Sequence, residues 1–136
     1  MKRLLRIPLT SALACALLAS CASAPTATRI ARATPELQAD VPHLHLPRAG
    51  LLTGGQPAAG AWRDLHAAGV TRVISLLPAS ELGARDEAAE VRASGMDSVR
   101  IDVAGANDLT AGKAQLLWQA LQGEPGTVLV HCASGN

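Results

Sequence analysis

The sequence has 136 residues, of which 49% are hydrophobic and 17% are charged, and its formal net charge is +1. This composition is typical of a single compact domain and excludes a disordered or fibrous chain. Without residues 1–20 the chain carries nine basic and 11 acidic side chains, so a basic surface for nucleic acid is not expected.

The N-terminal 20 residues have the layout of a signal peptide. Basic residues at positions 2, 3 and 6 precede an apolar stretch, Ile7–Ala19, that contains no acidic residue. The stretch leads into Leu18-Ala19-Ser20-Cys21, which resembles the lipobox of bacterial lipoproteins. That resemblance implies cleavage before Cys21 and acylation of its side chain. A plain secretory signal with a chance cysteine is the alternative.

The resemblance also indicates where the anchored protein resides. Ala22 and Ser23 follow the cysteine, and they lack the aspartate associated with inner-membrane retention of lipoproteins. We therefore expect an outer-membrane anchor that faces the periplasm. Residues 21–40 are rich in Ala, Thr and Pro without a sustained period, which predicts a flexible tether. The folded domain is then expected to comprise residues 41–136.

From residue 41 onward, apolar strand-like runs alternate with segments of helical period. The spacing predicts helices over Ala61–Gly69, Ala84–Gly95 and Thr110–Leu121, and strands over Val70–Leu77, Val99–Val103 and Thr127–His131. This βαβ order predicts an α/β fold with a largely parallel sheet flanked by helices. Because the chain has no Phe or Tyr, we expect both tryptophans in the core, with Trp118 on the apolar face of its helix.

A cysteine follows the last predicted strand. Cys15 would leave with the signal and Cys21 would be acylated, so Cys132 is expected to be the only free thiol. Ligands of open α/β sheets bind at the carboxyl ends of strands. The small residues after Cys132 leave backbone N–H groups uncovered, and such a loop binds anions and favours a thiolate. Phosphoryl transfer through a cysteinyl-phosphate requires this combination. A buried thiol that only fills space is the alternative.

The segment VLVHCASGN, at Val128–Asn136, resembles the signature loop of cysteine-dependent protein tyrosine and dual-specificity phosphatases. LLTGGQP, at Leu51–Pro57, and the following LHAAGVTRVISLLP make the domain similar to a small bacterial group related to beta-lactamase hydrolase-like proteins. The resemblance implies a phosphatase-like fold, no cofactor or metal ion, and a phosphorylated protein or small phosphate ester as substrate.

The same resemblance assigns roles within the loop. It implies that Cys132 is the nucleophile and that His131 orients and acidifies it. The phosphate would be bound by the loop residues Ala133, Ser134, Gly135 and Asn136, and the Ser134 hydroxyl would ease departure of the thiolate. Two alternatives stay open, since His131 can be a strand residue bonded to a backbone carbonyl and Ser134 can serve only as a small residue.

The general acid is expected in AGANDLT, a polar loop between a strand and a helix. Asp108 lies 24 residues before Cys132, a spacing that suits the resembled group, and it could protonate the leaving oxygen. Asp102 on the preceding strand is the rival, although solvent exposure is the favoured explanation of that residue. Asp108 has its own structural alternative, because an acid near the N-terminus of a helix contributes about 0.3–1 kcal/mol.

Other polar residues are weaker candidates. His43 and His45 share one face if their segment is extended, and histidines at that spacing can ligate a metal. No carboxylate or cysteine completes a set nearby, so a polar strand face is the favoured interpretation. Gln56 contacts the active-site region by resemblance, yet the glycines and proline beside it explain the turn without that role.

The sequence departs from the family pattern because no arginine follows Cys132 before Asn136. A guanidinium should hold two phosphate oxygens there, and Arg72 or Arg100 are the possible upstream substitutes. We therefore expect a chain truncated within its signature loop and inactive as it stands. Two alternatives remain open, a non-catalytic anchored module that binds an anion or a protein partner and a rhodanese-like sulfurtransferase. GGQP and the Asp108 loop favour the phosphatase.

Overall fold

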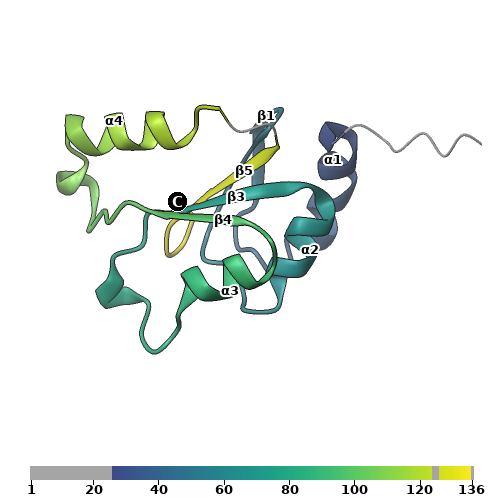
Figure 1. The fold of residues 1–136 in the computed structure, drawn as a ribbon, viewed down its shortest axis with the longest axis horizontal. Coiled ribbons are helices and arrows are strands. Elements are labelled where there is room, and N and C mark those ends of the chain that lie inside the picture. The colour runs from purple at the N-terminus through teal and green to yellow at the C-terminus, as the bar shows by residue number, and fades with distance from the viewer. Residues whose placement is uncertain (1–25, 124–125, 136) are drawn as a thin grey trace, which may run out of the picture.

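The computed structural model describes residues 26–123 and 126–135. Their secondary-structure elements, in chain order, are α1 (Thr26–Leu37), β1 (His45–Arg48), β2 (Leu51–Gly54), α2 (Ala61–Ala68), β3 (Val70–Ser75), the 3-10 helix η1 (Ala79–Glu81), α3 (Glu87–Ala93), β4 (Asp97–Arg100), the 3-10 helix η2 (Ala106–Asp108), α4 (Ala111–Ala120) and β5 (Thr127–His131). The strands form one sheet in the order β1-β2-β5-β3-β4 (Figure 1). The predicted α/β class is confirmed.

Parallel pairing dominates the sheet. Strand β5 lies between β2 and β3 and runs parallel to both, β4 is parallel to β3, and only the edge strand β1 is antiparallel to its neighbour. The register places His131 opposite Gly54 on one side and Ser75 on the other. The carboxyl ends of β2, β3 and β5 therefore meet at one edge of the sheet, where ligands of such sheets bind.

Local signals in the sequence set the helix boundaries. Gly69 ends α2 with a φ of 111°, a left-handed conformation that glycine adopts without strain. The Asp86 side chain accepts a hydrogen bond from the N–H of Ala89 and begins α3. Thr110 caps α4 in the same way, as the sequence predicts. Helix α3 begins at Glu87, later than the expected start at Ala84, because the Asp86 cap defines its first turn.

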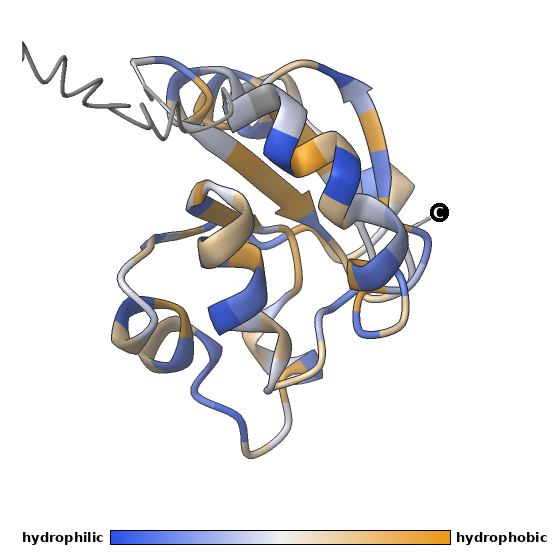
Figure 2. Ribbon diagram, turned by 90° about the vertical axis from the view of Figure 1, so that its right-hand side faces the viewer, coloured by the Kyte–Doolittle hydropathy of each residue, from blue (hydrophilic) through white to orange (hydrophobic). Residues whose placement is uncertain are grey.

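The two faces of the sheet are covered unequally. Helices α1, α2 and α3 contribute Ile30, Trp62 and Val91 to a large cluster on one face. A smaller cluster of Ile74, Ile101 and Val128 lies under α4 on the other face. Figure 2 shows a central strand coloured as hydrophobic, with hydrophilic stretches along the surrounding helices. The larger cluster supplies most of the apolar burial that stabilises the domain.

The expected flexible tether is wrong for the part that the structure describes, because Thr26–Leu37 forms helix α1. Ile30 and Leu37, seven residues apart, are buried against the domain and anchor the helix. The Ala-rich and Thr-rich composition conceals this sparse apolar stripe. The folded domain thus starts before residue 41. The predicted signal peptide and Cys21 lie outside the described residues.

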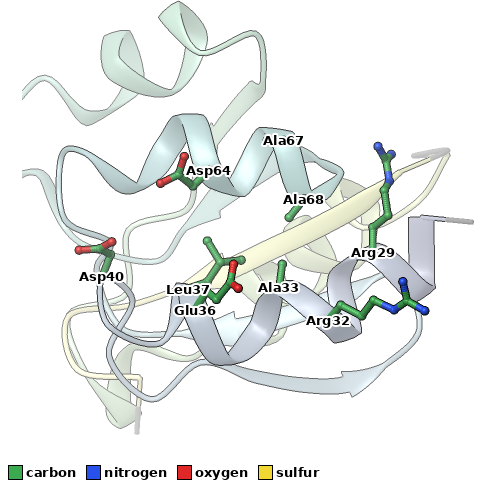
Figure 3. Close-up of a pocket in the computed structure, with 9 residues that line it drawn as sticks. All are labelled: Arg29, Arg32, Ala33, Glu36, Leu37, Asp40, Asp64, Ala67 and Ala68. Carbon is green, nitrogen blue, oxygen red and sulfur yellow. The ribbon is translucent and has the colours of Figure 1, made fainter. Parts of the chain in front are cut away.

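A pocket of about 450 Å³ lies between α1 and α2. Figure 3 shows its charges segregated, with Arg29 and Arg32 toward the beginning of α1 and Asp40 and Asp64 at the opposite end. None of the residues that line this pocket belongs to the Cys132 loop. The pocket is therefore separate from the predicted site.

Two further expectations are corrected. Trp118 is 61% exposed, because α4 turns Leu117 and Leu121 toward the smaller cluster instead. His43 does not share a strand face with His45, since it lies in a turn with a φ of 49° before β1 begins. Within the described part of the chain, no helix is long and apolar enough to cross a membrane.

Candidate active site

Cys132 directly follows β5 at the carboxyl edge of the sheet, beside the ends of β2 and β3. Its backbone N–H donates to the carbonyl oxygen of Gly54 at 3.3 Å, and the carbonyl oxygen of His131 accepts from the N–H of Leu76 at 2.8 Å. The thiol is half-buried and free. Hydrogen bonds on both sides therefore fix the position of Cys132, the candidate nucleophile.

The chain turns back over the thiol after Cys132. The N–H of Gly135 donates to Sγ of Cys132 at 3.2 Å, and Gly135 has a φ of 81°. A backbone donor aimed at sulfur favours a negative charge on it. The predicted phosphate-binding residues Ala133 and Ser134 are exposed on this turn. A turn follows the last strand, as the sequence predicts. Phosphate binding by its residues stays a prediction, and Asn136 lies outside the described residues.

The GGQP motif supports this turn from below. The N–H of Gln56 donates to the carbonyl oxygen of Ala133 at 3.1 Å. A Cβ on Gly55 would lie 2.9 Å from the carbonyl carbon of Ser134, so only glycine permits this close approach. The two motifs that carry the family resemblance thus lie in direct contact, which explains why both occur together.

His131 is 1% exposed and lies beneath the loop. Its Nδ1 is 3.2 Å from the carbonyl oxygen of Cys132, and its Nε2 is 3.2 Å from Oε1 of Glu87. The ring of Trp62 on α2 packs nearby, with ring centroids 6.3 Å apart. The contact with a backbone carbonyl that the alternative interpretation predicts is present, and a close contact with the buried carboxylate of Glu87 adds to it.

Glu87 is the functional candidate that the sequence analysis missed. It is 4% exposed on α3, and its Oε2 accepts a hydrogen bond from Nε2 of Gln56 at 3.0 Å. Burial alone would raise the pKa of Glu87, but the contacts with His131, Gln56 and Ser75 lower it to about 2. A signal was available, because Glu87 lies four residues before the core residue Val91 and shares its helix face.

A second ionic contact holds α3 against the rest of the site. Oε2 of Glu90 accepts from Nε1 of Trp62 at 2.8 Å and lies 2.5 Å from a guanidinium nitrogen of Arg85. Arg85 also donates to the carbonyl oxygen of Pro57 at 3.0 Å. The hydrogen bond from Arg85 lowers the pKa of Glu90. This contact therefore fixes α3, and with it Glu87, relative to GGQP.

Asp108 lies on η2, in the loop that follows β4. Its Oδ2 accepts from the N–H of Ala104 at 2.8 Å and from Nζ of Lys113 at 2.6 Å. The Ala104 hydrogen bond and the Lys113 contacts lower the pKa of Asp108. This arrangement favours the carboxylate, whereas a general acid must carry a proton. The rival Asp102 is exposed and pairs with Arg100 at 3.1 Å.

No cation follows Cys132 within the described loop residues 132–135. Arg72 donates to Asp97 and to the carbonyl oxygen of Ala120, each at 2.9 Å, and Arg100 pairs with Asp102. Neither arginine contacts the loop in these interactions. In the described ranges, no three His, Cys, Asp or Glu side chains group to hold a metal ion.

Several solved structures resemble this fold. A Shewanella putrefaciens CN-32 protein described as "Putative phosphatase (DUF442)" matches in two structures, at 31% identity over 74% of this chain, with TM-scores of 0.66 and 0.67. The chain spans 64% and 67% of the length of those two structures.

More distant structures share the fold alone. TpbA from P. aeruginosa matches at 20% identity with a TM-score of 0.57, over 75% of this chain and 57% of that one. A Neisseria meningitidis protein described as "a putative phosphatase" matches at 18% identity with a TM-score of 0.56, over 68% of this chain and 67% of that one. No protein-family model matches the sequence, and no curated protein does.

Proposed function

Because the chain belongs to the DUF442 family, we propose that it is a phosphoric monoester hydrolase that acts through a cysteinyl-phosphate intermediate. The observation that carries this proposal is the turn at residues 132–135, where the N–H of Gly135 donates to Sγ of Cys132. A thiolate held within a loop of backbone donors can attack phosphorus while the donors bind the oxygens.

The reaction has two steps. The Cys132 thiolate attacks the phosphorus, so that a P–S bond forms while the ester P–O bond breaks, and an acid gives the leaving oxygen its proton. Water then attacks the phosphorus, the P–S bond breaks, and inorganic phosphate and the thiolate are released. Asp108 is our candidate acid. Its carboxylate must release the ammonium of Lys113 and take up a proton before it can act as an acid.

A phosphorylated side chain is the substrate class that we propose. A cysteine-to-serine variant of TpbA has been solved in complex with phosphotyrosine, and that protein shares the fold of this chain. The described loop holds no cation, and a bidentate arginine usually binds the phosphate in such sites. We therefore propose that the described residues alone hydrolyse phosphate esters slowly at most.

We further propose that the protein is a lipoprotein anchored through Cys21 and facing the periplasm. The fold is compatible with this anchor, because Thr26 at the start of α1 lies against Gly69, directly before β3. Helix α1 thus begins at the amino edge of the sheet, opposite the Cys132 loop (Figure 1). The five residues from Cys21 to Thr26 reach at most about 18 Å, so the loop would face away from the bilayer.

Hydrolysis of a small aryl phosphate tests the proposed chemistry. For the chain expressed from its complete gene, we expect vanadate-sensitive hydrolysis that disappears in Cys132→Ser. Activity retained in that variant would exclude the cysteine mechanism. Sulfur transfer from thiosulfate to cyanide, without phosphate release, would instead support a rhodanese-like enzyme.

A further inference from the structure

A continuous line of contacts joins the GGQP motif to the nucleophile. Gln56 donates to one oxygen of Glu87 at 3.0 Å, and the other oxygen lies 3.2 Å from Nε2 of His131. The Nδ1 atom of the same ring lies 3.2 Å from the carbonyl oxygen of Cys132. Three separate segments, before α2, on α3 and on β5, thus converge on the backbone of the cysteine.

The surroundings of His131 suit a charged ring. A carboxylate and a backbone carbonyl are acceptors only, so a ring nitrogen that interacts favourably with either must carry a proton. Both nitrogens of His131 face such an oxygen. The Nε2 contact has the distance of an ion pair without the alignment of a hydrogen bond, which makes charge the main source of the attraction.

Few other charges compete for this ring. Glu90 on α3 is paired with Arg85, which precedes the helix, so these two charges largely offset each other. Helix α2 contributes the uncharged Trp62, and β3 contributes Ser75, which is opposite His131 in register. Glu87 is therefore the charged side chain in contact with the His131 ring among the described residues.

We propose that Glu87 is a positioning residue that keeps His131 charged and its ring fixed behind Cys132, and thereby stabilises the thiolate of the nucleophile. Glu87 acts through His131 and does not touch the reacting atoms. The inference rests on the proposed function, in which the Cys132 thiolate is the nucleophile. Burial supports it, because an ionised Glu87 at 4% exposure needs a cation beside it.

The test measures how fast iodoacetamide alkylates Cys132 as a function of pH, with the Cys132 peptide quantified by mass spectrometry. In Glu87→Gln we expect alkylation at pH 6 to slow about tenfold relative to the native chain, because a smaller fraction of Cys132 is then thiolate. At pH 9 we expect little change in the rate. Glu81→Gln is the control. It removes an exposed carboxylate on the 3-10 helix η1, away from these contacts, and we expect no change in its pH profile.

A double-variant experiment separates positioning from a general loss of structure. If Glu87 acts through the ring, Glu87→Gln should have no further effect on the profile in a His131→Gln background. A full additional shift in that background would overturn the proposal. An unchanged profile in a folded Glu87→Gln single variant would overturn it too.

If Glu87→Gln does not fold, a measurement on the native chain tests the proposal independently. Nitrogen-15 NMR of the His131 ring should show a proton on both nitrogens at pH 7, and a neutral ring with one bare nitrogen would contradict the proposal. Failure of the phosphatase proposal is recognised separately. A shifted alkylation profile together with no hydrolysis by the chain expressed from its complete gene would leave the Glu87 proposal standing and remove only the phosphatase.

Discussion

Gly135 and Gly55 pack backbone against backbone, with no room for a side chain between them. A Cβ on Gly135 would meet the backbone nitrogen of Gly55 and would lie 2.6 Å from the carbonyl carbon of Gly54. This contact joins the C-terminal turn to the GGQP motif, so the shape of the loop around Cys132 depends on both.

Gly135→Ala should therefore destabilise the loop. The substitution imposes a left-handed φ of 81° on alanine and also forces a clash with Gly54 and Gly55, so we expect a loss of about 1–3 kcal/mol in the free energy of unfolding. Urea denaturation measures this loss. Gly83→Ala is the control, because Gly83 has a φ of 62° but nothing within 4 Å. Equal losses in both variants would show that the packing contributes nothing.

The buried pair of Glu87 and His131 predicts a stability loss in acid. The pKa of Glu87 is about 2, below its usual value near 4.5, so the pair contributes fully above about pH 4.5 and its contribution is lost as the pH falls toward 2. The native chain should lose on the order of 3 kcal/mol more than Glu87→Gln over this range. Urea denaturation at several pH values checks this, and an unchanged difference would contradict it.

Lys113→Ala should raise the pKa of Asp108. The ammonium of Lys113 and the N–H of Ala104 both lower that pKa in the native chain, so it should move toward its usual value yet stay below it while the Ala104 bond persists. Carbon-13 NMR of the side-chain carboxyl reports the titration. Arg100→Gln, which removes the exposed pair with Asp102, should leave Asp108 unchanged. If Lys113→Ala also leaves it unchanged, the contact does not control Asp108.

The two tryptophans should respond differently to truncation. Trp62 is 2% exposed and donates to Glu90, so Trp62→Ala should cost about 3–5 kcal/mol through the cavity it leaves. Trp118 is 61% exposed, and Trp118→Ala should change the free energy of unfolding by less than about 0.5 kcal/mol. Thermal unfolding compares the two. Similar large losses would indicate that the face bearing Trp118 is covered in solution.

Much of the fold could be predicted from local patterns in the sequence. Apolar runs locate β3 and β5, Gly69 marks the end of α2, and Thr110 caps α4, because these signals depend on a few neighbouring residues. The Cys132 loop was predictable for the same reason. Helix α1 was not predictable, because its buried residues Ile30 and Leu37 are separated by small and polar residues. Their burial depends on packing against the rest of the domain, including α2.

The contact between His131 and Glu87 shows more clearly what a single sequence does not predict. His131 was predicted to act on Cys132, but its partner Glu87 lies 44 positions earlier in the chain. No spacing rule connects the two residues, because the crossover from β3 through α3 brings them together only in the folded sheet. Long-range polar pairs of this kind depend on packing that a single sequence does not display.

The proposed lipid anchor and the position of α1 together predict which edge of the domain lies nearer the membrane. Thr26 lies at the amino edge of the sheet and Cys132 at the carboxyl edge, so a fluorophore near the beginning of α1 should lie closer to the lipid headgroups than one on Cys132. The proposed anchor can be mimicked with a chain that starts at Ala22 and carries an N-terminal histidine tag. The tag attaches the chain to vesicles that contain nickel-chelating lipids. Energy transfer to a headgroup acceptor compares a label on Cys132 with one on Arg29→Cys in a Cys132→Ser background.

Stronger transfer from position 29 than from Cys132 is the expected result, because the predicted anchor is only five residues from Thr26 and the strands separate the two edges. Arg32, which lies toward the start of α1 (Figure 3) and is present in both labelled chains, should strengthen the difference on vesicles rich in anionic lipid. Equal transfer from both positions would mean that the domain tumbles freely on its anchor. The loop would then have access to phosphate esters in the bilayer as well as to those in solution.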